Sequence, residues 1–162
     1  MTVPVSGDGG AEIYAKLAEL GLKLPQVVPP LAAYVPAVQS GSYVYVSGQL
    51  PLVEGKLPYV GKVGAEVTAE DAAGYARTAA LNALAAAEAL LGSLDRVTRV
   101  VKVVGFVASD PEFYGQPGVL NGASELLGQI FGDAGVHARS AVGVAVLPLN
   151  SPVEVELILE FA

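Results

Sequence analysis

A single arginine opens an otherwise apolar stretch near the C-terminus of this chain. Arg139 follows the segment GVHA and leads into Ser-Ala-Val-Gly-Val-Ala-Val. A guanidinium presents a rigid fork of donors that matches a carboxylate through two parallel hydrogen bonds. Arg139 is therefore a candidate for binding a small organic acid. The alternative interpretation is an arginine at a strand end, in solvent or in a structural ion pair.

A glutamate stands near the start of the final stretch, PVEVELILEF, in which apolar and acidic residues alternate. This alternation predicts a strand that carries Glu154, Glu156 and Glu160 on one side. A partly buried Glu154 can hold and polarise a water molecule, and it reaches Arg139 if the two strands pair as a hairpin. Glu156 and Glu160 are expected on a solvated face.

Three further polar residues stand near the expected ends of elements. Tyr34 lies in the proline-rich segment LPQVVPPLAAYVPAV, where a fixed phenol can donate a hydrogen bond over a pocket or plug the edge of the core. Ser47 precedes Gly48 at the end of SYVYVSG, and its hydroxyl either contacts a ligand or caps the strand. Asn121 is expected at the start of a helix, as a polar group aimed at a cleft or as an ordinary cap.

The sequence indicates neither a metal site nor a catalytic triad. The chain has no cysteine and a single histidine, His137, so thiolate sites, disulfides and histidine clusters are excluded. Nothing pairs His137 with a nucleophile, and we expect it on a loop surface. The glycines form no phosphate-binding or dinucleotide-binding motif, so no cofactor is expected.

Composition argues against two kinds of partner. The net charge is -7, and the 9 lysines and arginines are scattered, whereas binding nucleic acid requires clustered basic residues. No apolar run approaches the roughly 20 residues of a membrane-spanning helix. The first residues, MTVPVSGDGGAEIY, lack the basic and apolar regions of a secretory signal. A cytoplasmic protein is expected, in keeping with the absence of cysteine.

Three helices are predicted from spacing and end signals. Apolar residues recur at helical spacing over residues 11–20. An alanine-rich helix begins after Thr68, a favourable N-cap, and ends before Gly92. A third helix is expected over residues 119–131, with its apolar residues on one side.

Alternating and β-branched residues predict strands between these helices. The resulting order of elements predicts an α+β fold with a single mixed β-sheet, two main helices packed on one face and an extra N-terminal helix. Residues 1–10 are expected to be flexible, and residues 11–162 to form one domain. The predicted strands cover about residues 42–48, 97–107, 138–148 and 152–161.

Both sides of the strand that carries Arg139 are largely apolar. Arg139, Ala141 and Gly143 are expected on one side, and the other side is rich in valine. An antiparallel sheet with one solvated face alternates apolar with polar residues, which this strand does not do. Because charged residues make up only 15% of the chain, we expect sister subunits to cover the second face.

Three stretches, in this order and at this spacing, carry a resemblance to a known family. AYVPAVQSGSYVYVSGQLP is similar to an opening in which a tyrosine precedes a strand that ends in Ser-Gly-Gln-hydrophobic-Pro. HARSAVGVAVLP is similar to an Arg-Ser strand that ends in Leu-Pro, and PVEVELI to a closing strand with alternating glutamates. Between them, VLNGASELLGQIF is similar to a second helix with Asn121 at the matching place. Over about residues 33–161 the chain thus resembles the Rid/YjgF (reactive intermediate deaminase) family.

The resemblance implies a chorismate-mutase-like fold that forms homotrimers with clefts between neighbouring subunits. It implies hydrolytic deamination of 2-aminoacrylate and other 2-imino acids to 2-keto acids and ammonia, with no metal or cofactor. Arg139 would clamp the substrate carboxylate with help from the backbone N–H of Ala141, and Glu154 would orient the attacking water. Tyr34 would complete the catalytic set, and Ser47 and Asn121 would line the pocket.

Two departures from the family pattern bear on the substrate. Ala141 stands where many relatives carry cysteine, and Gly143 where glutamate is common. A non-catalytic protein that binds a small carboxylate on the same scaffold is the alternative function. A ribonuclease ranks last, because the chain is acidic.

Overall fold

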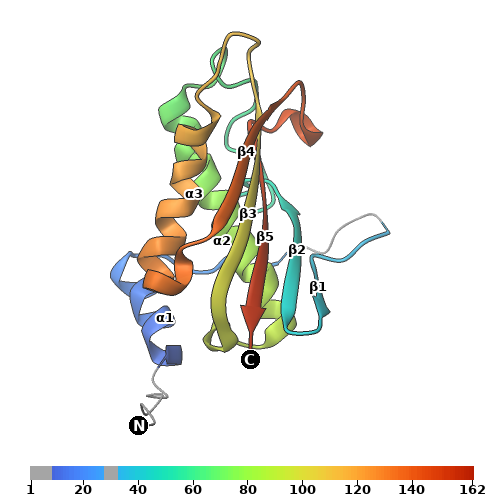
Figure 1. Ribbon diagram of the computed structural model, residues 1–162. Helices are drawn as coiled ribbons and strands as arrows, with labels where there is room; N and C mark the ends of the chain where they lie inside the picture. The colour runs from blue at the N-terminus through green and yellow to red at the C-terminus, as the bar shows by residue number, and fades with distance from the viewer. Residues whose placement is uncertain (1–8, 28–32) are drawn as a thin grey trace.

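Five strands and three α-helices make up the part of the chain that the computed structural model describes, residues 9–27 and 33–162 (Figure 1). The strands form one sheet in the order β1-β2-β5-β3-β4, in which β3 and β4 are parallel and all other neighbours are antiparallel. The predicted α+β class with a single mixed sheet is confirmed. The elements are α1 (Gly9–Glu19), β1 (Ala37–Ser40), β2 (Tyr43–Gln49), α2 (Ala69–Leu91), β3 (Val97–Ala108), α3 (Gln116–Phe131), β4 (Ala138–Val144) and β5 (Val153–Phe161).

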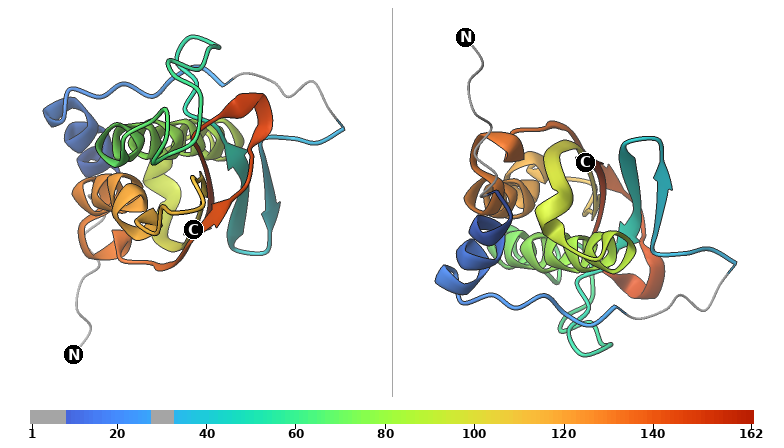
Figure 2. Two further views of the ribbon diagram at one scale, coloured as in Figure 1. Left: turned by 90° about the horizontal axis from the view of Figure 1, so that it is seen from above. Right: turned by 90° about the horizontal axis from the view of Figure 1, so that it is seen from below.

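The two long helices, α2 and α3, cover one side of the sheet (Figure 2). Strand residues that point toward them are buried, among them Val103 of β3 and Leu159 of β5. The predicted N-terminal helix is present, and α1 lies against α3 and the turn that follows α2. The core therefore lies between the sheet and the α2–α3 pair.

Helix α2 forms where its sequence predicts. The side chain of Thr68 accepts a hydrogen bond from the backbone N–H of Asp71 at 3.1 Å, which satisfies one free donor of the first turn. Gly92 ends the helix with a φ of 86°, a left-handed conformation that favours glycine. Most buried residues of α2 are alanines, and their small side chains let the helix lie close to its neighbours.

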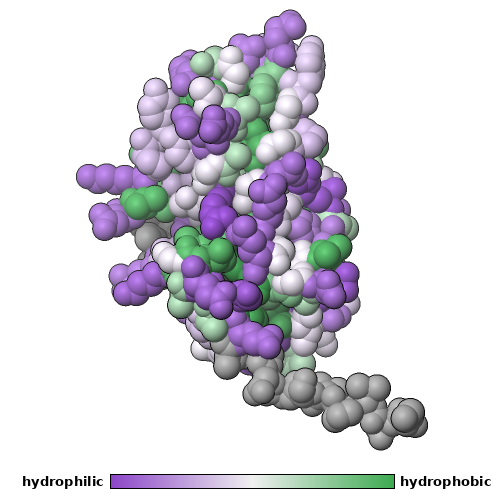
Figure 3. Space-filling model, turned by 90° about the vertical axis from the view of Figure 1, so that its left-hand side faces the viewer, coloured by the Kyte–Doolittle hydropathy of each residue, from purple (hydrophilic) through white to green (hydrophobic). Residues whose placement is uncertain are grey.

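The other side of the sheet has no covering layer among residues 9–27 and 33–162. Tyr45 of β2 is 43% exposed and Val142 of β4 is 44% exposed on this side. The surface beside α1 and α3, in contrast, is mostly hydrophilic, with apolar residues in small separate patches (Figure 3). Coverage of the open sheet face by sister subunits stays a prediction, and the apolar residues there are consistent with it.

A glycine sets how closely α2 and α3 approach. A Cβ added to Gly122 of α3 would lie 1.9 Å from the backbone oxygen of Ala73 in α2. Gly122→Ala is therefore expected to push the helices apart and to lower the free energy of unfolding by about 1–3 kcal/mol, measured by chemical denaturation. Gly128→Ala, in the same helix but with open space around its Cβ, is the control and should stabilise the chain by up to about 1 kcal/mol. Equal effects of the two substitutions would contradict the close approach.

The structure corrects two local predictions. Strands β4 and β5 do not pair as a hairpin, because β3 lies between them. Helix α3 begins at Gln116, three residues before the predicted start, with Pro117 in its first turn. Asn121 therefore lies inside the helix and is not its cap.

Some of the sequence predictions concern residues outside the described ranges. Residues 1–8 hold most of the predicted flexible N-terminus, and Gly9 and Gly10 belong to α1. Residues 28–32 hold part of the proline-rich segment, whose continuation forms the edge strand β1. Across the described ranges, none of the helices combines the length and apolarity needed to cross a membrane.

Candidate functional site

Arg139 lies on β4, on the side of the sheet that faces the helices. Its register partner on β3 is Val103, which is fully buried under the helices. Ala141 pairs with Gly105 and shares this side, as the alternation in the sequence predicted. The half-buried Arg139 side chain therefore extends over α3 and does not reach the open face of the sheet.

Three acceptors on α3 hold the guanidinium. Arg139 Nη1 donates to Asn121 Oδ1 at 2.8 Å and to Ser124 Oγ at 3.1 Å, and Nη2 donates to the Pro117 carbonyl oxygen at 3.3 Å. A guanidinium has five N–H donors, so these bonds leave one donor on Nε and one on Nη2. No carboxylate of residues 9–27 and 33–162 lies within ion-pair distance of the Arg139 guanidinium. The two remaining donors can bind a planar carboxylate side by side.

The open edge of β4 adds a backbone donor. The carbonyl oxygen of Val144 accepts a hydrogen bond from the N–H of Ser109, which directly follows β3, so the Val144 carbonyl points toward β3. Because strand residues alternate in direction, the N–H of Ala141 points away from β3. β4 is the last strand of the sheet, so this N–H is unpaired within the sheet and lies near Arg139.

Glu154 lies on the opposite face of the sheet. It pairs with Phe106 of β3, and its half-buried side chain crosses the backbone of β2 at Gly48. A Cβ added to Gly48 would lie 2.5 Å from Glu154 Oε1, so a larger residue at this position would require the carboxylate to move. Burial raises the pKa of Glu154, and the nearby carboxylate of Glu156 raises this pKa further. Like Glu154, the side chains of Glu156 and Glu160 are half-buried, so the face on which they were expected to be solvated is only partly accessible at both.

Ser47 ties the segment that carries Tyr34 to β2. Its hydroxyl donates to the Val35 carbonyl oxygen at 2.7 Å, and its N–H donates to the Pro36 carbonyl oxygen at 2.8 Å. The Ser47 hydroxyl proton is thus engaged within the chain, and only its oxygen remains as an acceptor for a ligand. Tyr34 is 57% exposed, next to the start of β1.

The candidate residues therefore form two groups. The arginine group comprises Arg139, Asn121 and the N–H of Ala141, at the β4 edge of the sheet. The glutamate group comprises Glu154, Ser47 and Tyr34, on β5, β2 and the segment before β1. Arg139 and Glu154 lie on opposite faces of the sheet with β3 between their strands, so a single chain does not bring these two side chains together.

Two residues of the arginine group's surroundings were not predicted. Ser124 lies one helical turn after Asn121 and bonds the same nitrogen of Arg139. His137 lies in a loop, as predicted, but its side chain is half-buried and bonds Ser124, which was not predicted. The spacing of three residues between Asn121 and Ser124 was the available signal, since such residues share a helix face.

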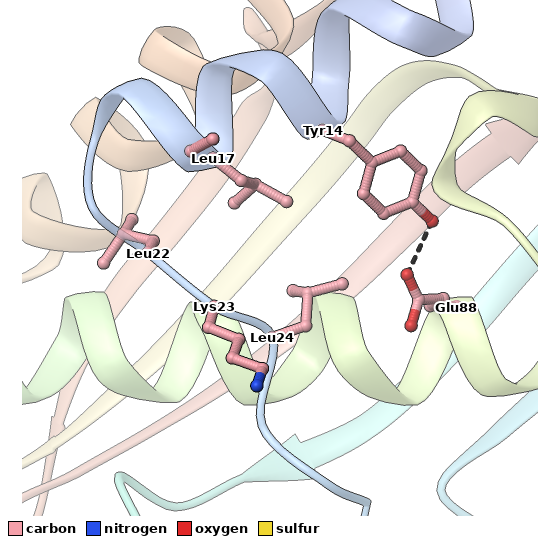
Figure 4. Close-up of a pocket in the computed structure, with 7 residues that line it drawn as sticks. Tyr14, Leu17, Leu22, Lys23, Leu24 and Glu88 are labelled. Atoms are coloured by element: carbon pink, nitrogen blue, oxygen red, sulfur yellow. Dashed lines mark hydrogen bonds between the residues drawn. The ribbon is translucent and has the colours of Figure 1, made fainter.

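A separate hollow of about 270 Å³ lies between α1 and α2 (Figure 4). Its walls are mostly apolar, and the Tyr14 hydroxyl donates to Glu88 Oε2 at 2.6 Å across one end. Burial and this hydrogen bond to Glu88 raise the pKa of Tyr14. These contacts hold α1 against α2, and the hollow contains none of the candidate residues. Its lining consists of Tyr14, Leu17, Ala18, Leu22, Lys23, Leu24 and Glu88.

Comparison with known proteins gives a consistent family. The family model described as "YjgF/chorismate mutase-like, putative endoribonuclease" matches residues 14–161. Protein TCP17 of Trypanosoma cruzi is 44% identical over 161 residues, which cover 99% of this chain and 98% of that protein. The structure of Atu1372 from Agrobacterium tumefaciens, a protein with unknown function, is 45% identical with a TM-score of 0.88 and covers 95% of this chain and 96% of that one.

The name of a more distant relative's structure includes a bound ligand. E. coli TdcF with bound serine is 25% identical, with a TM-score of 0.61, and covers 85% of this chain and 94% of that one. The family match over residues 14–161 includes all five strands and helices α2 and α3. The chain therefore belongs to the YjgF/RidA family and has the chorismate-mutase-like fold.

Proposed function

We propose that the chain is an enamine and imine deaminase, which hydrolyses 2-aminoacrylate and other 2-imino acids to 2-keto acids and ammonia. The observation that carries this proposal is the guanidinium of Arg139, which α3 holds in place while two of its donors stay available. Such a fork recognises a planar carboxylate, the group that every 2-imino acid shares. The unpaired N–H of Ala141 adds a donor to the same carboxylate.

The reaction requires little beyond positioning and one proton-transfer group. The enamine tautomerises to an imine, water adds to the C=N carbon, and the tetrahedral adduct expels ammonia and leaves the 2-keto acid. Positioning can lower such a barrier by several kcal/mol, and a general base adds about 10²–10⁴-fold. No metal or cofactor enters this scheme.

Glu154 is the proposed general base. Its raised pKa supports this role, because a base with a pKa closer to the working pH takes a proton from water more readily. The same carboxyl group, once protonated, can return the proton to the departing amine. Tyr34, which belongs to the glutamate group, is also proposed to contact the substrate.

The division into two groups supports a site between two copies. Arg139 and Glu154 lie on opposite faces of one sheet, so one molecule of substrate cannot touch both within a chain. We propose that the arginine group of one copy faces the glutamate group of the next around a homotrimer, which also covers the open sheet face. A protein that binds carboxylates without turnover remains the second candidate, since the arginine group alone suffices for binding.

The test is the release of pyruvate from freshly generated 2-aminoacrylate. The wild-type protein is expected to accelerate it, and Arg139→Lys to reduce kcat/KM by about 10–100-fold, because lysine keeps the charge without the fork. Arg77→Lys is the matched control, because Arg77 lies on α2 and bonds Gln129, outside both groups. Pyruvate binding without acceleration would favour the non-catalytic protein, and equal rates for wild type and Arg139→Lys would contradict the clamp.

A further inference from the structure

Behind the Arg139 guanidinium, a chain of hydrogen bonds runs to the single histidine. Ser124 Oγ lies 3.1 Å from Arg139 Nη1 and 2.8 Å from His137 Nε2. His137 Nδ1 lies 2.6 Å from the carbonyl oxygen of Gly135. Four residues from α3, β4 and the short 3₁₀ helix Gly132–Gly135 with its following turn are thus linked in series.

The direction of these hydrogen bonds follows from the groups that take part. A carbonyl oxygen can only accept, so His137 Nδ1 carries the proton that it shares with Gly135. In the neutral ring Nε2 is then an acceptor, and the hydroxyl proton of Ser124 points at it. The lone pairs of Ser124 Oγ are left for Arg139 Nη1, which can only donate. Every donor in the series therefore has one acceptor.

The far end of the series is fixed to the core. Gly135 is buried, and an added Cβ there would lie 2.4 Å from the backbone oxygen of Leu127 in α3. The 3₁₀ helix is thus packed tightly on α3, and the Gly135 carbonyl is a fixed anchor for the imidazole. The imidazole in turn fixes the rotation of the Ser124 hydroxyl, whose proton would otherwise turn freely.

We propose that Ser124 and His137 are positioning residues for the Arg139 carboxylate clamp. Together with Asn121 Oδ1, Ser124 Oγ occupies both N–H groups of Nη1, which defines the plane of the guanidinium. The donors on Nε and Nη2 are then aimed away from α3, where a carboxylate can meet both. The proposal rests on the proposed function only for the identity of the acid, because the orientation of Arg139 exists without any ligand.

The first test requires no ligand. Nitrogen-15 NMR of the arginine side chains should give separate Nη signals for Arg139 in the wild-type protein, because three acceptors hinder rotation of its guanidinium. Ser124→Ala and His137→Phe are each expected to merge these signals into an average. Ser124→Thr, which keeps the hydroxyl, should keep them separate. Averaged Arg139 signals in the wild-type protein would overturn the proposal, whatever the protein does to 2-aminoacrylate.

The second test measures binding of pyruvate, the keto acid of the proposed reaction, by calorimetry. Ser124→Ala and His137→Phe should each weaken binding about three- to tenfold, and the double variant should lose little more, because both residues act through one series. Ser140→Ala removes the same group from the other face of β4 and should bind as the wild type does. Independent, multiplying losses, or a Ser124→Ala variant with wild-type affinity, would contradict the positioning role. Pyruvate binding by the wild type without deaminase activity would sink the proposed reaction and leave the positioning role standing.

Discussion

Oligomers assembled from equal amounts of Arg139→Ala and Glu154→Gln chains are expected to regain about a quarter of the wild-type deaminase activity, although each variant alone has almost none. The reason is that Arg139 and Glu154 lie on opposite faces of one sheet, with β3 between their strands. If each site takes Arg139 from one copy and Glu154 from the next, random mixing places an intact arginine group against an intact glutamate group at about one interface in four.

The measurement is the rate of pyruvate release after the two variants have been unfolded and refolded together. Chains that carry Arg139→Ala and Arg139→Gln, mixed in the same way, are the control, because no pairing of these two can supply an arginine. Complete inactivity of the Arg139→Ala and Glu154→Gln mixture, with oligomers of wild-type size, would show that the two residues do not share a site between copies.

The faces of the strands were predicted correctly from the sequence, and the neighbour of β4 was not. Alternation along β4 placed Arg139, Ala141 and Gly143 on one side, and their register with β3 confirms this. The predicted hairpin of β4 and β5 was wrong, because two strands joined by a short link do not have to pair with each other. The link between them has positive φ values at Leu149 and Asn150 and carries the chain across β3.

A signal for the correct neighbour was present in the order of the elements. A strand, a helix and a second strand in succession, here β3, α3 and β4, commonly form a parallel pair joined by the helix. That unit places β4 beside β3 and its Arg139 against α3, where Pro117, Asn121 and Ser124 supply the acceptors. The start of α3 was also within reach, because proline favours the first turn of a helix.

The contacts of His137 and Ser47 had no such signal. His137 reaches Ser124 because the 3₁₀ helix packs on α3, and that packing depends on the space left by Gly135. Ser47 bonds the Val35 carbonyl because β1 folds back beside β2. Both contacts join residues whose proximity arises only from tertiary packing, which periodicity along a single element does not encode.

Glu154→Gln is expected to abolish most deaminase activity and to make the fold more stable near neutral pH. Glutamine cannot take a proton from water, so kcat/KM should fall by about 10²–10⁴-fold. Burial, and then Glu156, raise the pKa of Glu154 above its ordinary value, so the ionised carboxylate opposes folding. Glutamine has nearly the same shape without the charge, and the variant should have a higher Tm at pH 7. A group that serves as base in the reaction would thus weaken the fold that holds it.

The pH dependence separates this explanation from a general effect of the substitution. An acid with a raised folded pKa binds more protons in the folded state, so it stabilises the fold at low pH. That contribution is lost as the pH rises from the unfolded pKa, about 4.3, through the higher folded pKa. The Tm advantage of Glu154→Gln over wild type should therefore be small below pH 4 and should grow across this window. Glu156→Gln, which removes the second cause of the shift, should keep the carboxylate of Glu154, the proposed base, and move the acidic limb of the wild-type kcat/KM profile to lower pH. A Tm advantage that is the same at every pH would exclude a raised pKa at Glu154 as the cause, and an acidic limb that Glu156→Gln leaves in place would exclude a contribution of Glu156 to that pKa.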